Sequence, residues 1–199
     1  MIITVKNALP KELCDFLSIE FSMMKNCIAT MKYNKEAFDH PSIGKNTFSW
    51  YSPLCFEALL VYLQPIVEQN VGKKLIPTYS YGRIYWKGSE LKRHTDRNSS
   101  EVTASCCLKK DVDWSLNYDF NNEIISANLD VGDISISHGS KIPHWREKYS
   151  GKEHIQAFVQ YVYADGEYNH LIYDTRPCLA APYETVSDEV KREFENQYK

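Results

Sequence analysis

The stretch YSYGRIYWKGSELKRHTDR, residues 79–97, decides both the fold and the site that we predict for this chain. Its first half alternates aromatic residues with small or polar ones, a pattern typical of a half-buried β-strand. Its second half contains His94 and Asp96, which would point to the same side of an extended strand and could face one point in space. By itself, H-x-D is a weak signal, and such a tripeptide is more often a surface salt bridge or a helix cap. Arg97 and Glu101 follow closely, either as a pair that orients this loop or as an exposed ion pair.

A second histidine could complete a metal site with the H-x-D pair. Residues 129–133 (LDVGD) predict a turn, β character resumes after it, and His144 follows 50 residues after His94. Two histidines and one carboxylate on one face of a metal leave the opposite positions open, which suits Fe(II) with a co-substrate and O₂. Zinc could use the same ligands. We expect His94, Asp96 and His144 to be the ligands, with His138 as the second candidate for the distal position.

The flanking patterns predict the rest of the architecture. Further strands are expected at residues 102–108, 113–118, 124–129, 134–136 and 154–163. A first helix is expected from Pro10, with one apolar face made of Leu13, Phe16, Leu17, Phe21 and Met24. A second helix is expected from Pro53, where Pro65 should kink or end the helix and the inward residues are Phe56, Leu60, Leu63 and Val67. A third helix is expected at residues 187–198, with Ser187 as its N-cap. The polar residues 32–45 predict a loop, either a plain connector or a lid.

Helices followed by many short antiparallel strands predict an α+β fold, a double-stranded β-helix (jelly roll) braced by N-terminal helices. We expect one domain over residues 1–199. Residues 1–75 would form the helical support, 76–165 the jelly-roll core, and 166–199 a C-terminal extension with a helix.

Composition excludes several classes of protein. Of 199 residues, 43% are hydrophobic and 13% aromatic, and a net charge of −3 gives no domain-wide basic field, so we expect no nucleic-acid partner. No apolar run approaches the length of a membrane span, and the N-terminus does not resemble a signal peptide, so we expect no membrane association and a cytoplasmic location.

The six cysteines form no C-x-x-C pair and are expected to be reduced, with one residue of Cys106-Cys107 buried and the other facing outward.

The order of these motifs resembles the Fe(II)/2-oxoglutarate-dependent dioxygenases, in particular their prolyl 4-hydroxylase-like branch. The resemblance covers roughly residues 76–164. Residues 85–97 are similar to that branch's Y-x-x-G…H-x-D segment, and residues 129–133 followed by Pro143-His144 are similar to its turn and distal histidine. The resemblance implies that Tyr85 faces 2-oxoglutarate.

The chain departs from the family pattern at one position. The family places an arginine or lysine nine to eleven residues after the distal histidine, where it binds the far carboxylate of 2-oxoglutarate, but here these positions hold Glu153, His154 and Ile155. We favour Arg146 for this role, because it would share the strand face of His144 and can pair bidentately with a carboxylate. His154 and Lys152 are the rivals, and Arg146 could instead pair with Glu147 or Asp133.

The resemblance implies an enzyme that hydroxylates an unactivated C–H bond while 2-oxoglutarate is decarboxylated to succinate. The implied cofactors are Fe(II), 2-oxoglutarate and O₂, with ascorbate in a supporting role. The implied substrate is a prolyl or other amino-acid side chain in a protein or peptide, or a small molecule. Two alternatives remain open: a cupin-type jelly-roll metalloenzyme that does not use 2-oxoglutarate, and a non-catalytic metal-binding jelly-roll module. The sequence gives no oligomeric state.

Overall fold

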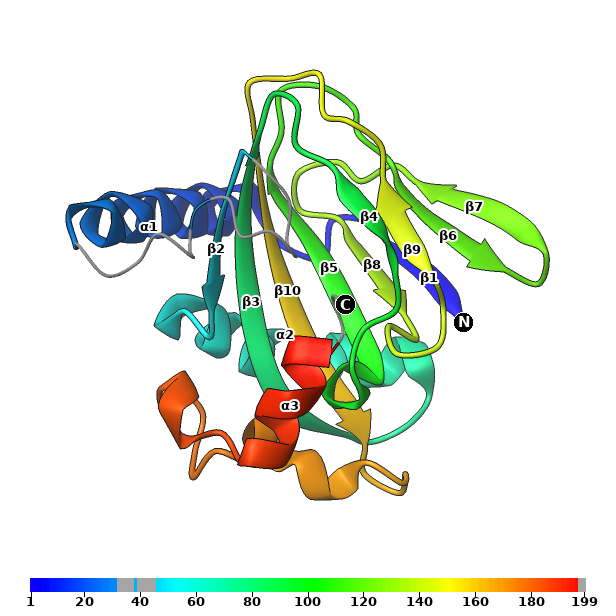
Figure 1. The fold of residues 1–199 in the computed structure, drawn as a ribbon. Coiled ribbons are helices and arrows are strands. Elements are labelled where there is room, and N and C mark those ends of the chain that lie inside the picture. Colours follow the sequence, from blue (N-terminus) through cyan, green and yellow to red (C-terminus); the bar gives the residue numbers. More distant parts are fainter. Residues whose placement is uncertain (32–37, 39–45, 197–199) are drawn as a thin grey trace.

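Two antiparallel β-sheets and a layer of helices make up the structure, a computed structural model that describes residues 1–31, 38 and 46–196 (Figure 1). The larger sheet has the spatial order β1 (Ile2–Val5), β8 (Ile134–Ser137), β5 (Val102–Lys109), β10 (Glu153–Tyr163), β3 (Leu75–Trp86) and β2 (Thr47–Tyr51). The smaller sheet has the order β4 (Leu91–His94), β9 (His144–Arg146), β6 (Leu116–Phe120) and β7 (Glu123–Ala127). This arrangement confirms the predicted jelly roll.

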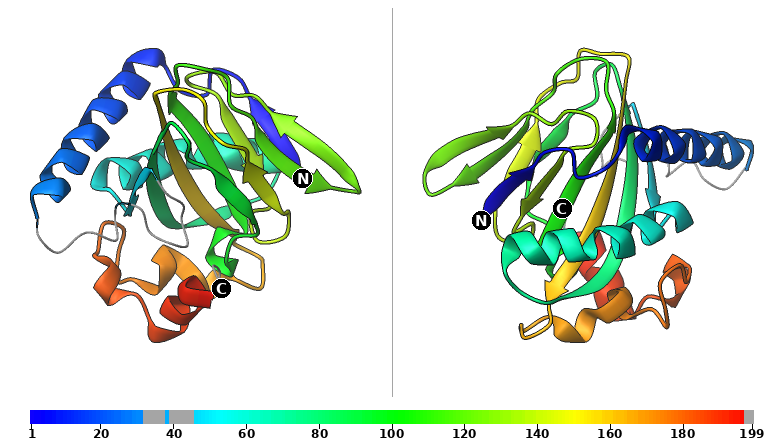
Figure 2. Two further views of the ribbon diagram at one scale, coloured as in Figure 1. Left: turned by 45° about the horizontal axis from the view of Figure 1, so that its top comes forward. Right: turned by 180° about the vertical axis from the view of Figure 1, so that it is seen from behind.

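The outer face of the larger sheet is covered by α1 (Lys11–Thr30) and α2 (Leu54–Val71), which lie in front of the sheet in the right view of Figure 2. The predicted inward residues Phe56, Leu60, Leu63 and Val67 of α2 are all fully buried in the core that the helices share with this sheet. Gly82 allows the close approach, since a Cβ at this position would overlap the Phe21 ring and lie 2.8 Å from the Phe56 ring.

The helix prediction is wrong for Phe16 and for one of the two alternatives at Pro65, that it ends the helix; the other alternative, a kink, stays a prediction. Phe16 was expected on the same face of α1 as Leu17 and Phe21, but it is 63% exposed and borders an apolar hollow beside α2. Pro65 does not end α2, which continues to Val71. The helix ends instead at Gly72, which adopts a left-handed conformation with φ 71° and donates its N–H to the Glu68 carbonyl.

The inner face of the larger sheet is unusually polar, and this face positions the site. Alternation along β3 directs Tyr79, Tyr81, Arg83 and Tyr85 to the interior between the sheets, while Ser80, Gly82 and Ile84 face the helices. The other central strands contribute further buried polar side chains to the interior: Thr103 and Ser105 from β5, Ser135 and Ser137 from β8, and His154, Gln156 and Gln160 from β10.

The C-terminal extension runs along one end of the barrel and ends with α3 (Asp188–Asn196), drawn in red in Figure 1. Before it come two short 3₁₀ segments, η3 (Asn169–Thr175) and η4 (Tyr183–Thr185). The predicted N-cap of α3 is present: the Ser187 hydroxyl accepts the N–H of Val190 at 3.5 Å. Asp174 in η3 forms a buried ion pair with Arg97, so the predicted pairing of Arg97 with Glu101 is wrong. Glu101 instead accepts the backbone N–H of Tyr163.

Several predicted features have further outcomes. The short strands β1 and β2 were not predicted, whereas β4 and β9 were expected as the strands around His94 and His144, without bounds. The loop or lid expected at residues 32–45 lies, except for Phe38, outside the described residues. All six cysteines are free. Cys107 is not outward-facing as expected but fully buried like Cys106, because the second sheet covers the face to which it points. Within the described part of the chain, no helix combines the length and apolar character that a membrane span requires.

Candidate metal centre

His94 and His144 are brought together by direct pairing of two short strands. His94 is the last residue of β4 and His144 the first of β9, and the two are opposite each other in the antiparallel ladder. Their ring centroids are 4.4 Å apart although 50 residues separate them in sequence. The cross-strand pairing therefore achieves what the H-x-D motif alone cannot, which is to place the second imidazole beside the first.

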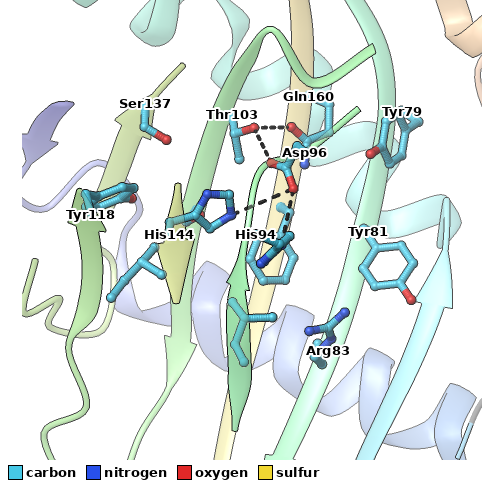
Figure 3. A pocket seen from close by; sticks show the side chains of 14 residues that line it. Tyr79, Tyr81, Arg83, His94, Asp96, Thr103, Tyr118, Ser137, His144 and Gln160 are labelled. Atoms are coloured by element: carbon cyan, nitrogen blue, oxygen red, sulfur yellow. Dashed lines mark hydrogen bonds and ion pairs between the residues drawn. The ribbon is translucent and has the colours of Figure 1, made fainter. Parts of the chain in front are cut away.

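Both imidazoles are held by the same kind of hydrogen bond. Nδ1 of His94 donates to the Lys92 carbonyl at 2.7 Å, and Nδ1 of His144 donates to the Ile142 carbonyl at 3.0 Å. Because a carbonyl oxygen can only accept, Nδ1 carries the proton in each ring and Nε2 carries the lone pair. Both Nε2 atoms face Oδ1 of Asp96, at 3.5 Å from His94 and 3.7 Å from His144 (Figure 3).

Asp96 is fixed through its other oxygen and its backbone. The Thr103 hydroxyl lies 3.1 Å from Oδ2 of Asp96 and 2.6 Å from Oε1 of Gln160, so the two oxygens share one donor, and Oδ1 of Asp96 points toward the histidines. The Asp96 N–H donates to the carbonyl of Gly139 at 2.9 Å. Gly139 leaves room for this arrangement, because a Cβ there would overlap the Thr103 hydroxyl and lie 2.5 Å from Oδ2 of Asp96. Neither Thr103 nor Gly139 was predicted. The sequence shows Gly139 only as a residue typical of turns, because its role at the site depends on its contact with the distant loop that contains Asp96.

The protonation states suit a metal site. Burial opposes ionisation of Asp96, but hydrogen bonds and electrostatic attraction from His144 and His94 outweigh it and hold its pKa below the usual value. Burial lowers the pKa of His144. At neutral pH the carboxylate is therefore ionised and the His144 imidazole is neutral, so neither must lose a proton before binding a metal.

The three side chains form a donor set that fits one cation. One ligand atom from each of His94, Asp96 and His144 lies within 4.8 Å of the other two. Two imidazole nitrogens and one carboxylate oxygen on a single face leave the opposite coordination positions open, a set typical of non-haem Fe(II) sites. The alternative ligand His138 lies apart from this group, with its Nε2 2.8 Å from the Tyr163 hydroxyl.

The donor set lines a cavity between the two sheets (Figure 3). Apart from His94, Asp96 and His144, the wall consists of aromatic, polar and aliphatic side chains from both sheets and one arginine: Tyr79, Tyr81, Arg83, Leu91, Thr103, Ser105, Leu116, Tyr118, Ser137, Phe158 and Gln160. His94 and Asp96 also line an open hollow on the outside, together with Arg93, Asn98 and Glu193. The donor set therefore borders space on two sides.

The four residues predicted to contact 2-oxoglutarate are not among those that line the cavity. Tyr85, Arg146 and His154 are buried deeper between the sheets, around the Trp114 ring, and Lys152 is exposed. Arg146 donates to the Trp114 carbonyl and to the Gln156 side chain, and not to Glu147 or Asp133. Burial and the Arg146 charge lower the pKa of His154 well below its usual value, so His154 is neutral at pH 7. The roles assigned to these four residues stay predictions.

Solved structures share this architecture. HygX from Streptomyces hygroscopicus, crystallised with nickel and 2-oxoglutarate, superposes with a TM-score of 0.61 at 12% identity, over 82% of this chain and 83% of that one. A Pseudomonas putida prolyl-4-hydroxylase gives 0.61 at 14% identity, over 81% and 92%. SnoK, a non-haem α-ketoglutarate-dependent carbocyclase from nogalamycin biosynthesis, gives 0.64 at 12% identity, over 85% of each chain. This chain has the fold of the 2-oxoglutarate-dependent oxygenases.

Neither a protein-family profile nor a curated protein sequence matches the chain, so among the comparisons the fold is matched by solved structures. Within this fold, sequence reasoning missed one charged wall residue of the cavity, Arg83. The sequence did contain a signal for Arg83. It lies two residues after Tyr81 and two residues before Tyr85, so strand alternation places all three side chains on the same inner face.

Proposed function

We propose that the protein is an Fe(II)- and 2-oxoglutarate-dependent dioxygenase that hydroxylates an unactivated C–H bond. The reaction balances as R–H + 2-oxoglutarate + O₂ → R–OH + succinate + CO₂. The observation that carries the proposal is the donor set of His94, Asp96 and His144, with both Nε2 atoms facing one carboxylate oxygen inside a jelly roll. The shared fold supports the same conclusion.

In this proposal His94, Asp96 and His144 hold the iron, which when bound supplies the chemistry of O₂ activation. The residues of the chain determine geometry and solvent access. The Lys92 and Ile142 carbonyls fix the ring orientations, and Thr103 fixes the carboxylate. Leu91, Leu116 and Phe158 make part of the cavity wall apolar, which limits water at the reacting centre.

The substrate would approach from the outer hollow, since His94 and Asp96 border it as well as the inner cavity. Arg93 and Glu193 give this hollow both signs of charge, and Asn98 adds a neutral amide. Groups of this kind suit the charged and amide groups of an amino acid or peptide, so we propose a prolyl or other amino-acid side chain as the substrate class. A small molecule is the second candidate, because HygX, with this fold, was crystallised with hygromycin B.

Succinate formation without added substrate tests the reaction class. Purified protein with Fe(II), ascorbate and 2-oxoglutarate in air should release succinate slowly. His144→Ala should reduce the rate at least about 100-fold, because loss of one of three protein ligands removes most of the metal affinity. His138→Ala is the matched control and should keep the rate within about twofold, since His138 contacts Tyr163 and not the donor set.

The alternatives give different results in the same assay. A cupin-type enzyme would bind iron without consuming 2-oxoglutarate. A non-catalytic module would bind iron without turnover of any 2-oxo acid, with or without a candidate substrate. Either outcome, or equal rates for the wild-type protein and His144→Ala, would contradict the proposed function.

A further inference from the structure

We propose that Arg83, with the hydroxyl of Tyr85, binds the distal carboxylate of 2-oxoglutarate. This inference rests on the proposed function, because it assigns a role toward the same co-substrate. It differs from the family pattern, in which the cation follows the distal histidine in sequence. Here the cation would come from β3, before the H-x-D motif.

The chemistry of the co-substrate requires a cation inside the barrel. 2-Oxoglutarate is a dicarboxylate, and only its 2-oxo acid end can chelate a metal. The other carboxylate must lie some distance from the metal, within the cavity. A buried carboxylate is costly unless it is paired and hydrogen-bonded, and a guanidinium is the side chain best shaped to pair with it through two parallel hydrogen bonds.

Arg83 is placed for this role. Among the described residues that line the cavity of His94, Asp96 and His144, it is the one arginine or lysine. Its side chain is almost fully buried, at 4% exposure, and Figure 3 shows it below the donor set on the β3 side. The neighbouring wall residues Leu91 and Phe158 are apolar. A carboxylate there would be shielded from bulk water, which strengthens its attraction to the guanidinium.

The strand register relates Arg83 to the position where the resemblance expects a cation. That position is His154 on β10, and it pairs with Tyr85 on β3. Arg83 is the next inward residue along β3, and it pairs with Gln156. Arg83 and His154 are thus diagonal neighbours on one face of the sheet, a spacing that long side chains can bridge. The positive charge lacking on β10 is therefore present on the adjacent strand.

Two hydroxyls and two aromatic rings contact the guanidinium. Nε of Arg83 donates to the Ser49 hydroxyl at 3.1 Å, and Nη1 donates to the Tyr85 hydroxyl at 3.4 Å. The guanidinium carbon also lies 5.5 Å from the ring centroids of both Tyr81 and Tyr85. This framework orients the fork before the ligand arrives, which lowers the entropic cost of binding. The contact with Tyr85 places its hydroxyl beside Arg83, where the two groups can share one carboxylate.

The other candidates have less suitable surroundings. Arg146 stacks on Trp114, with 4.6 Å between its guanidinium carbon and the ring centroid, and it donates to the Trp114 carbonyl and to Gln156. Arg97 and Arg176 are in buried ion pairs with Asp174 and Glu57. Lys152 is exposed.

An anaerobic titration compares two 2-oxo acids on the same protein. Fe(II)-loaded protein is titrated with 2-oxoglutarate and with 2-oxobutyrate, which lacks the distal carboxylate, and the charge-transfer absorbance of the chelate in the green is followed. The wild-type protein should bind 2-oxoglutarate about 100-fold more tightly. Arg83→Met should lose this preference by weakening 2-oxoglutarate about 100-fold while leaving 2-oxobutyrate within about threefold. Arg83→Lys, which keeps the charge without the fork, should be intermediate.

The rival assignment is tested in the same way with Arg146→Met, and Lys152→Met is the exposed matched control. The inference is overturned if Arg83→Met keeps the wild-type preference, or if Arg146→Met loses the preference in its place. Co(II) absorbance in the absence of any 2-oxo acid shows whether each variant is folded and retains the metal site. The inference also fails if the wild-type protein binds Fe(II) but gives no chelate band with either acid, and in that case the proposed function fails with it. If Arg83→Met gives the chelate band with 2-oxoglutarate at the wild-type affinity, the role of Arg83 is overturned and the proposed function is not.

Discussion

At the scale of single residues, the candidate metal centre depends on small groups as much as on its three donors. The donors come from ordinary side chains, but their directions are set by two backbone carbonyls, one threonine hydroxyl and the absence of a side chain at Gly139. Groups that orient ligands in this way commonly change metal affinity 10- to 100-fold when they are altered. Gly139 is the most constrained of them, since its neighbours include both Asp96 and Thr103.

Gly139→Ala should weaken metal binding by at least about tenfold. The new Cβ would overlap the Thr103 hydroxyl and lie 2.5 Å from Oδ2 of Asp96, so the carboxylate must move. Titration with Co(II), followed by absorbance, measures the effect. Gly166→Ala is the control, because its nearest neighbours are at 3.0 Å or more and belong mainly to Tyr163. Wild-type metal affinity in Gly139→Ala would contradict this account of the site.

At the scale of elements, the C-terminal segment η3 is tied to the loop that contains Asp96. Arg97 directly follows Asp96 and donates two hydrogen bonds of 2.5 Å to the carboxylate of Asp174. Tyr51 of β2 donates to the same carboxylate at 2.6 Å. Asp174 has a left-handed backbone, with φ 59°, and so do its neighbours Tyr173 and Thr175. Three consecutive residues of this kind are costly, and the buried ion pair is one of the interactions that can offset the strain.

Asp174→Asn should lower the free energy of unfolding by about 3 kcal/mol, because it leaves the buried Arg97 guanidinium without its counter-charge. Chemical denaturation at pH 7 measures this change. Asp165→Asn is the matched control: Asp165 is 70% exposed in its pair with Lys73, and the loss should be below about 1 kcal/mol. Similar losses for the two variants would show that η3 is not held by this pair.

At the scale of the whole molecule, the larger sheet has two different faces. Its outer face packs against α1 and α2 in a large apolar core, while its inner face presents hydroxyls, amides, histidine and arginine to the space between the sheets. Burying polar side chains costs free energy. The fold therefore relies on the outer core for stability and keeps the interior for ligand chemistry.

The buried histidine of this interior makes global stability depend on pH. Burial and Arg146 hold the folded-state pKa of His154 well below 6.5. The unfolded chain then takes up a proton near pH 6.5 that the folded chain does not, so stability falls as the pH decreases through that value. From pH 7 to pH 5.5 this histidine should contribute a loss of up to about 1.2 kcal/mol. Chemical denaturation at both pH values should show that His154→Phe loses less stability than the wild-type protein, and equal losses would refute this role of His154.

The sequence determined the parts of this protein that depend on local order. Period-two alternation predicted β3, and β-forming residues predicted β5, β8 and β10. Period 3.6 predicted the buried face of α2, and H-x-D followed by Pro143-His144 identified the three residues that the structure brings together. Strand alternation fixes the direction of a side chain from its neighbours alone, and such patterns remain readable without knowledge of the fold.

Only the tertiary structure decided the features that depend on pairing between distant segments. The short strands β4 and β9 have too few residues to show a period, and they form because each pairs with the other. The partner of Arg97 is 77 residues away in a segment with no strong pattern, and the role of Gly139 arises from its contact with Asp96. Arg83 was on a predicted strand, but its presence in the metal cavity depends on how two sheets face each other. Contacts of this kind follow from the packing of the whole chain and leave little trace in local sequence.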